Sequence, residues 1–428
     1  MDKLIVEGGR PLGGTVRSSG SKNAVLPILA AAILTRERLR VENVPDLADV
    51  RTMLAVLREL GVEGESAAEG GALEVEASGG LAPRAGWDNV RRMRGSVCVL
   101  GPLLARCGRA EVSLPGGCVF GVRPIDVHLK GMRALGADVR VEHGFVLAEA
   151  PAGGLVGASM YLGSSFGSSV LGTANVMMAA TLARGRSVIQ GAACEPEIVD
   201  LADCLNAMGA KVRGQGSPCI EIEGVDELGG ATHRVIPDRI EAGTYLVAGA
   251  LSGGRVRVED CRPDHLAVLF DRLREAEVPF EVGADWAEIQ PFDPRAQRAR
   301  STDVTTHPYP GFPTDLQAQW MALMSLADGI SIIHERIYPD RWMHLPELER
   351  LGAQVRRQGT TAIVRGCEAL SGAPVTASDL RASAALVLAG LVAQGTTEVH
   401  RVYHIDRGYQ RIEERLQGLG AAIRRERE

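Results

Sequence analysis

One pattern recurs six times along this sequence of 428 residues and constrains its fold more than any other feature. In five copies a helical segment reaches Leu or Met, then Gly, then Ala or Val, and continues into a β-rich run, and the sixth copy is a degenerate version of this pattern. The key positions are 61, 136, 209, 277, 352 and 420, so each copy is about 70 residues of mixed α/β. The copies read MLAVLRELGVEGE, HLKGMRALGADVRVE, IVDLADCLNAMGAKVRG, HLAVLFDRLREAEVPFEV, HLPELERLGAQVRRQ and RIEERLQGLGAAIRRE.

Glycine at the key position has a local physical cause. Many helices end at a residue with left-handed backbone, which glycine adopts without a steric penalty because it has no Cβ. We therefore expect a helix to end at each key position and a strand to follow it. Glu277 stands where the other five copies have glycine.

Each copy also contains a helix that is apolar on every side, as in NAVLPILAAAIL, NVMMAATLA and ASAALVLAGLVA. Helices of this kind are buried. Six copies in two groups of three predict an α/β protein of two similar domains with buried central helices.

Composition and motifs exclude several classes of function. A net charge of −6 argues against a nucleic-acid partner. The 8 cysteines are too few for a disulfide framework and form no C-x-x-C pair, and no H-E-x-x-H is present, so we expect no metal site. The chain has neither a P-loop nor a strand–GxGxxG–helix unit, which excludes a P-loop NTPase and disfavours a dinucleotide fold.

Nothing in the sequence indicates export or membrane insertion. The segment MDKLIVEGGRPL lacks the basic and apolar regions of a secretory signal. The longest apolar stretches are shorter than the ~18 residues that a membrane span needs. We therefore expect a cytoplasmic protein.

The apolar helices begin with polar residues of particular kinds. Helix N-termini attract anions, because their free N–H groups carry partial positive charge. Lys22, Arg94 and Arg381 oppose that dipole and are poor caps, so their presence needs another reason. A bound anion is one such reason. The starts of the six helices carry Lys22-Asn23, Arg94-Gly95-Ser96, Ser168-Ser169, Glu241, Asp315 and Arg381.

Cys118 lies in SLPGGCVFGVRPIDVH, a stretch with neither helical nor strand periodicity. A structural cysteine normally lies on an apolar face of a helix or strand. Cys118 follows two glycines and precedes Arg123, which predicts a chemical role instead of a packing role.

Eight motifs in order give the chain a resemblance to the UDP-N-acetylglucosamine enolpyruvyl transferases of the enolpyruvyl transferase family. The resemblance runs from LIVEGGRPLGGTV to RGYQRIEERLQGLGA. The motifs are SGSKNAVLP, SLPGGCVFGVRPIDVH, EPEIVDLA, PDRIEAGTY, FPTDLQAQ, RWMHLPEL, SDLRASAALVLAG and YHIDRGYQRIEE.

The resemblance implies a fold of two domains, each an inside-out α/β barrel of three βαβαββ-type units with the active site in the cleft between them. One domain would comprise residues 22–236 and carry the Cys118 loop. The other would comprise residues 1–21 and 237–428.

The resemblance also implies a reaction. The enolpyruvyl group of phosphoenolpyruvate would pass to the 3'-hydroxyl of UDP-N-acetylglucosamine through a tetrahedral ketal, with loss of phosphate. No metal or organic cofactor is required. This is the committed step of peptidoglycan synthesis, on which cell shape and division depend, and the antibiotic fosfomycin would attack Cys118.

By the same resemblance, Cys118 is the general acid and Asp315 takes the proton from the sugar hydroxyl. Lys22 and Asn23 would bind phosphoenolpyruvate. The arginines would bind its charged groups, with Arg123 and Arg407 on the phosphate and Arg341 and Arg381 on the carboxylate or the intermediate. The Cys118 loop would close over the bound substrates.

A third set of residues matches positions that contact the nucleotide sugar. Its members are Arg94, Arg123, Pro124, Ile125, Asp126, Val127, Ser169, Val170, Asp315 and Ile337. One segment, GSSFGSSVLGTAN, departs from the family pattern. A lysine that approaches the diphosphate becomes Gly167 here, and a family glycine becomes Leu171, which places the diphosphate contact in question.

Two alternatives remain open at this point. The related 3-phosphoshikimate enolpyruvyl transferase shares the fold and the donor, but the Cys118 loop resembles that of the sugar-nucleotide enzyme. A weakly catalytic, ligand-binding regulatory paralogue would fit the altered Gly167 segment, but Cys118, Asp315, Lys22 and the arginines are all retained.

Overall fold

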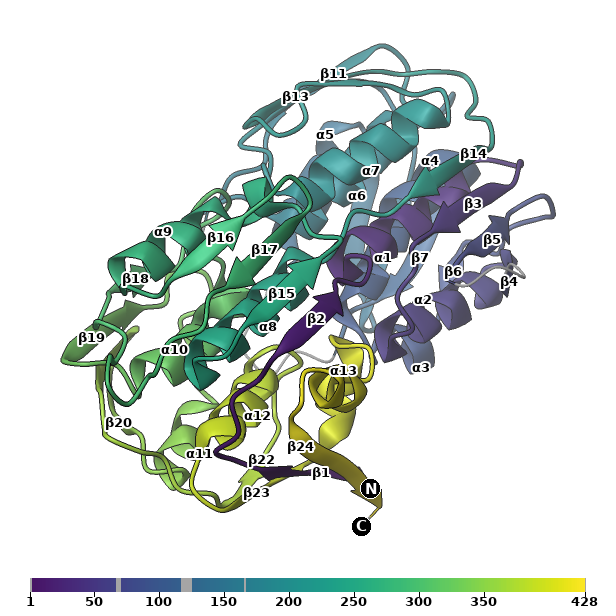
Figure 1. Cartoon of the computed structure of the whole chain (residues 1–428). Helices are drawn as coiled ribbons and strands as arrows, with labels where there is room; N and C mark the ends of the chain where they lie inside the picture. The colour runs from purple at the N-terminus through teal and green to yellow at the C-terminus, as the bar shows by residue number, and fades with distance from the viewer. Residues whose placement is uncertain (1, 67–70, 117–124, 165–166, 428) are drawn as a thin grey trace. The chain divides into compact units, whose positions relative to one another are not determined.

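The computed structural model describes residues 2–66, 71–116, 125–164 and 167–427 (Figure 1). The described residues form two compact units. We call residues 20–236 the continuous unit, and residues 2–19 with 237–427 the divided unit, and describe each by itself. None of the helices in these ranges is long and apolar enough to cross a bilayer.

The continuous unit contains three four-stranded sheets and the helices that they cover. Its helices are α1 (Lys22–Ala31), η1 (Ala32–Leu34), α2 (Ala48–Glu59), α3 (Trp87–Val90), η2 (Arg94–Val99), α4 (Leu100–Cys107), α5 (Asp126–Ala134), α6 (Val170–Ala180) and α7 (Pro196–Ala207). Its strands are β3 (Leu39–Glu42), β4 (Glu63–Ser66), β5 (Leu73–Glu76), β6 (Arg84–Ala85), β7 (Arg109–Ser113), β8 (Asp138–Glu142), β9 (Phe145–Glu149), β10 (Ser159–Tyr161), β11 (Arg186–Gln190), β12 (Lys211–Arg213), β13 (Cys219–Glu223) and β14 (Ala231–Arg234).

The divided unit is built in the same way. Its helices are α8 (Arg239–Ser252), η3 (Pro263–Leu266), α9 (Ala267–Glu275), η4 (Thr314–Leu316), α10 (Gln317–Met324), α11 (Leu345–Arg350), α12 (Ala382–Val392), η5 (Val402–Arg407) and α13 (Ile412–Gly418). Its strands are β1 (Asp2–Glu7), β2 (Gly14–Arg17), β15 (Val256–Glu259), β16 (Phe280–Val282), β17 (Trp286–Ile289), β18 (Val304–Thr305), β19 (Ile330–His334), β20 (Gln354–Gln358), β21 (Thr361–Arg365), β22 (Pro374–Thr376), β23 (Thr396–His400) and β24 (Ala422–Arg427).

All six sheets share one topology. In the sheet β10-β11-β13-β12, the first two strands are parallel and are joined through the buried helix α6. Helix α7 then leads to the antiparallel hairpin β12–β13, and β13 pairs with β11. This is a β-α-β-α-β-β unit, and a parallel pair needs such a helical crossover because its strands cannot be joined by a tight turn.

The chain passes between the units inside two of these repeats. Strand β2 pairs in parallel with β15, and β14 pairs in parallel with β3. Strand β1 completes the last sheet by pairing with β23 and β24, so the two chain termini lie side by side (Figure 1).

The left-handed backbone expected at the six key positions is confirmed. The φ angles lie between +58° at Glu277 and +101° at Gly209, and each of these residues follows a helix. Glu277 therefore adopts the conformation that its five glycine counterparts adopt without strain.

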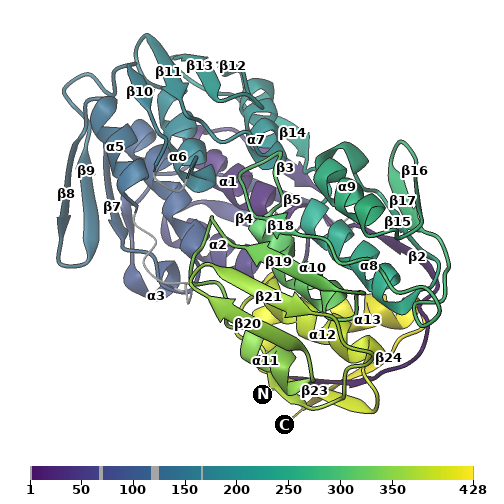
Figure 2. The ribbon, with the colours of Figure 1, turned by 90° about the vertical axis from the view of Figure 1, so that its left-hand side faces the viewer.

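Buried helices form the centre of each unit, as expected. Every residue of α8 is buried, and so are the residues of α6 from Gly172 to Ala180 and those of α12 from Ala382 to Leu391. Figure 2 shows α1, α5 and α6 between the sheets of the continuous unit. Strands such as β13 alternate buried and exposed residues, because one sheet face covers the helices and the other meets solvent. The α/β class with helices inside is confirmed. The sheets of the described residues remain separate, without forming a closed barrel.

Candidate active site

Lys22 is the first residue of α1, and its ammonium group is buried. Its Nζ lies 2.7 Å from Oδ2 of Asp49 in the first turn of α2, with side-chain exposures of 8% and 2%. Buried charges of this kind need a partner, because desolvation of a lone ion costs several kcal/mol. A protein carboxylate thus accompanies this cation, and Asn23 follows it on the same helix.

Asn175 of α6 joins the elements that carry several proposed nucleotide-sugar contacts. Its Oδ1 accepts from the backbone N–H of Gly101 at 2.6 Å, which fixes the amide orientation. Its Nδ2 donates to the carbonyl of Val97 at 2.7 Å and lies 3.0 Å from Nδ1 of His128. The buried amide thus connects α6 with η2, which begins at Arg94, and with α5.

His128 is held neutral beside these residues. Burial, and then the charge of Arg94, lower the pKa of His128 to about 3. Since the Nδ2 of Asn175 can only donate, Nδ1 of His128 accepts and its proton lies on Nε2.

The other described residues of this unit that are predicted to contact the nucleotide sugar lie at the starts of helices. Ile125 is buried at the N-cap of α5, and Asp126 and Val127 open that helix. Ser169 caps α6, because its side chain accepts from the N–H of Gly172 at 3.1 Å, and Val170 is the first residue of α6.

Gly167 has a backbone conformation that a lysine would rarely adopt. Its φ is +96°, and its N–H and C=O both bond to the backbone of Ser164, at 3.1 and 2.8 Å. At the position where the resemblance predicts a lysine in relatives, this chain thus has a backbone conformation that favours glycine.

Three predicted residues, Cys118, Arg123 and Pro124, lie outside the described residues. Their assignment as general acid, phosphate ligand and nucleotide-sugar contact stays a prediction.

Asp315 lies in the divided unit, in the 3-10 helix η4, where Pro313 is the N-cap. Its Oδ1 is 2.6 Å from Nη1 of Arg341. Asp379 holds the other side of that guanidinium, with Oδ2 2.8 Å from Nε and Oδ1 3.3 Å from Nη2. Arg341 and Asp379 are 4% and 1% exposed, whereas Asp315 is 25% exposed. Of the two carboxylates, Asp315 is the one that a substrate can reach.

Each charged group in this cluster stabilises the charged form of its neighbour. Burial by itself raises the pKa of Asp379, but the charge of Arg341 and its hydrogen bonds outweigh burial, so the pKa of Asp379 is lowered. The two carboxylates in turn raise the pKa of Arg341 above its ordinary value, despite burial. The cluster therefore holds Asp379 ionised beside a permanent cation.

Arg381 is the N-cap residue of α12 and is 1% exposed. Its Nη2 lies 2.6 Å from Oδ2 of Asp238, its Nη1 donates to the carbonyl of Gly408 at 2.7 Å, and it lies over the ring of Tyr409 at 5.1 Å. Asp238 also caps α8 by accepting from two backbone N–H groups through Oδ1. In this conformation the anion beside Arg381 is thus a protein carboxylate.

The other two predicted residues of this unit lie on loops and short helices. The N–H of Ile337, after β19, donates to Oε1 of Glu335 at 2.8 Å. Arg407 is the last residue of η5 and is partly buried. Through Asp379, whose Oδ1 also accepts from the N–H of Arg381 at 2.7 Å, the structure brings Asp315, Arg341 and Arg381 together.

Sequence reasoning missed the carboxylates that hold these cations. Asp379 stands two residues before Arg381, and Asp238 precedes a helix as an N-cap would, so both had local signals. Asp49 had only its place near the start of a helix.

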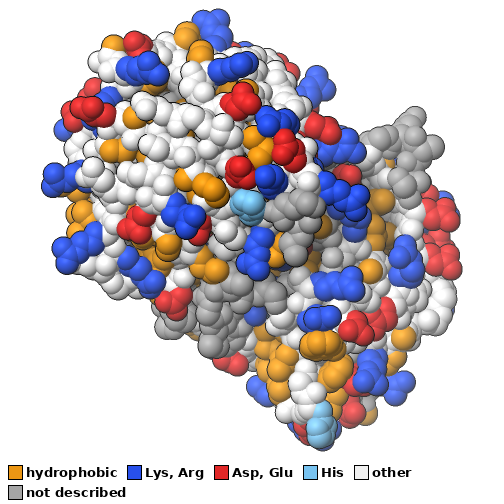
Figure 3. Space-filling model, turned by 90° about the horizontal axis from the view of Figure 1, so that it is seen from below, with side chains coloured by type: hydrophobic (Ala, Val, Ile, Leu, Met, Phe, Trp, Pro, Cys, Tyr) orange, Lys and Arg blue, Asp and Glu red, His pale blue; other side chains and the backbone are white. Residues whose placement is uncertain are grey.

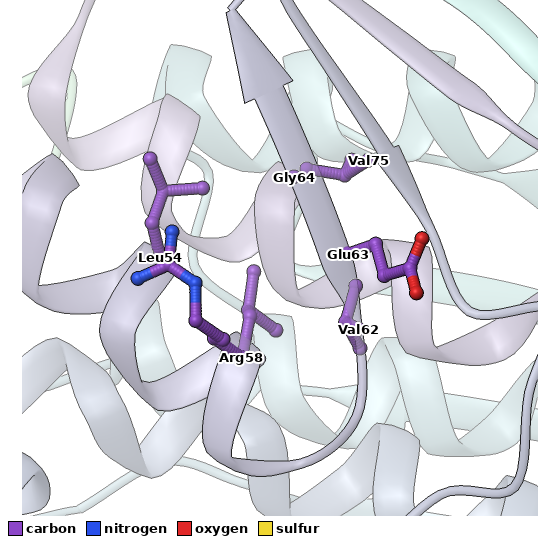
Figure 4. A pocket seen from close by; sticks show the side chains of 7 residues that line it. Leu54, Arg58, Val62, Glu63, Gly64 and Val75 are labelled. Carbon is purple, nitrogen blue, oxygen red and sulfur yellow. The ribbon is translucent and has the colours of Figure 1, made fainter.

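Other surface features do not add to the site. A shallow hollow between α2 and the β4–β5 hairpin is lined by Leu54, Leu57, Arg58, Val62, Glu63, Gly64 and Val75 (Figure 4), and none of these residues is a predicted site residue. On the face shown in Figure 3, Lys and Arg side chains are interspersed with Asp and Glu. Within the described ranges, no three His, Cys, Asp or Glu side chains are placed to hold a metal ion.

Comparisons with known proteins show the family to which the chain belongs. The family model of EPSP synthase (3-phosphoshikimate 1-carboxyvinyltransferase) matches residues 6–416. The UDP-N-acetylglucosamine 1-carboxyvinyltransferase of Anaeromyxobacter sp. (strain Fw109-5) is 54% identical over 433 residues, covering 100% of both chains. The protein of the same name from Coxiella burnetii (strain Dugway 5J108-111) is 51% identical over 425 residues, 99% of this chain and 96% of that one.

Solved structures show the same fold. The enolpyruvyl transferase NikO from Streptomyces tendae matches with a TM-score of 0.89 at 27% identity, covering 99% of this chain and 98% of that one. EPSP synthase from Acinetobacter baumannii matches with a TM-score of 0.73 at 17% identity over the full length of both chains, which concerns the fold alone. The chain belongs to the enolpyruvyl transferase family.

Proposed function

We propose that this enzyme transfers the enolpyruvyl group of phosphoenolpyruvate to the 3'-hydroxyl of UDP-N-acetylglucosamine and releases phosphate. The observation that carries the choice of acceptor is the full-length identity of 51–54% to proteins named UDP-N-acetylglucosamine 1-carboxyvinyltransferase. The observation that supports the chemistry is the accessible carboxylate of Asp315, held against the buried cation of Arg341.

Asp315 acts as the general base in this proposal. Its carboxylate, 2.6 Å from Nη1 of Arg341, takes the proton of the 3'-hydroxyl as the hydroxyl oxygen bonds to C2 of phosphoenolpyruvate. Cys118 gives a proton to C3, and the product of addition is a tetrahedral ketal. Loss of a proton from C3 and departure of phosphate from C2 then restore the double bond.

Cations bind the donor, which carries both phosphate and carboxylate. Lys22 and Asn23, with Arg123 and Arg407, would contact phosphoenolpyruvate and its phosphate, while Arg341 and Arg381 would serve the carboxylate or the intermediate. Arginine suits these groups because its planar fork binds them through two hydrogen bonds. Arg341 and Arg381 would keep their protein carboxylates as second partners, which fixes the direction of each guanidinium.

The nucleotide sugar would contact the start of α5, the start of α6 and the loop after β19. The residues proposed for it are Arg94, Arg123, Pro124, Ile125, Asp126, Val127, Ser169, Val170, Asp315 and Ile337. The glycine turn at Gly167 would leave the diphosphate with one cation fewer than in relatives that carry a lysine there. The reaction would supply peptidoglycan synthesis from the cytoplasm.

A second candidate follows from the matching family model, whose description names 3-phosphoshikimate as the acceptor. It differs only in the acceptor, and the first proposal is preferred because the relatives above cover the whole chain at 51–54% identity.

The product tests the proposal. Mass spectrometry of a reaction with both substrates should detect UDP-N-acetylglucosamine bearing an enolpyruvyl ether. Asp315→Asn should lower kcat by ~10²–10⁴-fold, the usual contribution of a positioned base. The exposed Asp264→Asn is the matched control and should retain full activity. Near-normal turnover by Asp315→Asn would remove Asp315 as the base.

A further inference from the structure

We propose that Glu335 and Thr314 form a hydrogen-bond relay that positions Arg341 against Asp315. This inference rests on the proposed function, and neither residue is among the predicted site residues. Both act through Arg341, so they are positioning residues.

Glu335 lies immediately after β19 and is 0% exposed. Its Oε1 accepts from the N–H groups of Ile337 and Tyr338, at 2.8 and 2.9 Å, and from the hydroxyl of Thr306 at 2.7 Å. Its Oε2 accepts from the hydroxyl of Thr314 at 2.9 Å. A buried carboxylate needs such donors, and here all four are uncharged.

The direction of the hydrogen bond at Thr314 has a consequence for Arg341. An ionised carboxylate can only accept, so the hydroxyl hydrogen of Thr314 points at Glu335. The Thr314 oxygen then presents its lone pairs to Nη1 of Arg341, which donates to it at 3.1 Å. The same Nη1 donates to Asp315 at 2.6 Å, so Thr314 and Asp315 together fix that end of the guanidinium.

Glu335 therefore serves two parts of the site. Through two backbone N–H groups it holds the loop of Ile337, and through Thr314 it orients the cation that faces the base. Burial raises the pKa of Glu335, and the hydroxyl of Thr306 and the charge of Arg341 oppose that rise. A variant that removes the charge of Glu335 but keeps the shape of its side chain therefore tests the relay without removing a side chain from the core.

Glu335→Gln is such a variant, and the structure fixes how its amide lies. The N–H groups of Ile337 and Tyr338 can only donate, so the glutamine carbonyl must take the place of Oε1. Its NH₂ group then faces Thr314 and reverses that hydrogen bond. The Thr314 oxygen would then accept from the new amide as well as from Arg341, which weakens its hold on Nη1.

The test compares kcat, KM and thermal stability in five variants of the whole enzyme, one of them a control. Glu335→Gln and Thr314→Val should each lower kcat by roughly tenfold to a hundredfold, the equivalent of one hydrogen bond to a charged group. The double variant should fall no further, because both changes break one relay. Thr314→Ser keeps the hydroxyl and should restore kcat to within about twofold of wild type.

Thr306→Val is the matched control. It removes the other hydroxyl that donates to Glu335, but Thr306 has no bond to Arg341. It should lower the melting temperature while kcat stays within about twofold of wild type. Equal losses of kcat in Thr306→Val and Thr314→Val, or multiplied losses in the double variant, would overturn the relay.

Different results would refute the relay and the proposed function. Ratios of variant to wild type are measured with whichever acceptor the wild type uses, so a different acceptor refutes the function alone. A crystal structure of Thr314→Val gives a readout independent of activity. We expect Nη1 of Arg341 to move out of hydrogen-bond range of Asp315, and an unchanged contact would refute the relay.

Discussion

Asp379→Asn provides a quantitative test of the buried cluster around Arg341. The carboxylate makes two hydrogen bonds to that guanidinium and accepts a third from the N–H of Arg381. Removal of one partner of a buried ion pair costs ~3–5 kcal/mol, because the remaining charge stays desolvated. Asn keeps the shape of the side chain and one acceptor oxygen, and Asp315 still faces Arg341. We therefore expect the substitution to lower the free energy of unfolding by ~3 kcal/mol at pH 7, near the low end of that range.

The stabilisation by Asp379 should depend on pH in a definite direction. Because the folded pKa of Asp379 is lowered, its contribution to the free energy of unfolding is present above the unfolded value of ~3.9. That contribution is lost as the pH falls below ~3.9 through the folded pKa. The difference between wild type and Asp379→Asn should therefore be constant near neutral pH and shrink in acid.

Urea unfolding followed by tryptophan fluorescence measures this difference. Trp286, Trp320 and Trp342 belong to the divided unit and report on it. Asp264→Asn is the matched control, since its carboxylate also binds an arginine through two oxygens but is 59% exposed. The control should change the free energy of unfolding by less than about 0.5 kcal/mol. Equal effects of the two substitutions at pH 7 would refute the reasoning about burial.

Three further predictions concern single residues. Glu277→Gly should raise the free energy of unfolding by ~1 kcal/mol, because φ is +58° there, and an unchanged urea midpoint would contradict the strain. Gly167→Lys should fail to lower the KM for UDP-N-acetylglucosamine, since the φ of +96° opposes a side chain, and a clear fall in KM would show that the turn adapts. Fosfomycin should add covalently to Cys118 and leave the exposed Cys219 unmodified, and peptide mass spectrometry showing an unmodified Cys118 would remove it as the reactive thiol.

Local features of the sequence were enough to predict much of the fold. The six key positions have left-handed backbone because helix termination is a local property, and Glu277 kept it without glycine. The apolar helices are buried because they have no polar face. The two crossings between units, inside the β2–β15 and β14–β3 pairs, depend on strand pairing across distant segments and were not visible in the pattern.

Part of the site was also predictable from local features of the sequence. Lys22, Arg94 and Arg381 were singled out because a cation at a helix N-terminus is unusual, whereas Asp315 was assigned through the family resemblance. Their partners were missed because pairing depends on tertiary contacts, as between Arg381 and Asp238, 143 residues apart. The roles assigned to the site residues, above all to Cys118 and Arg123 outside the described residues, stay predictions.

The identity of the acceptor separates the two candidate functions, and a phosphate-release assay distinguishes between them. The wild-type enzyme is given phosphoenolpyruvate with either UDP-N-acetylglucosamine or shikimate 3-phosphate, and free phosphate is measured over time. We expect release with UDP-N-acetylglucosamine and none above background with shikimate 3-phosphate. Release only with shikimate 3-phosphate would contradict this expectation.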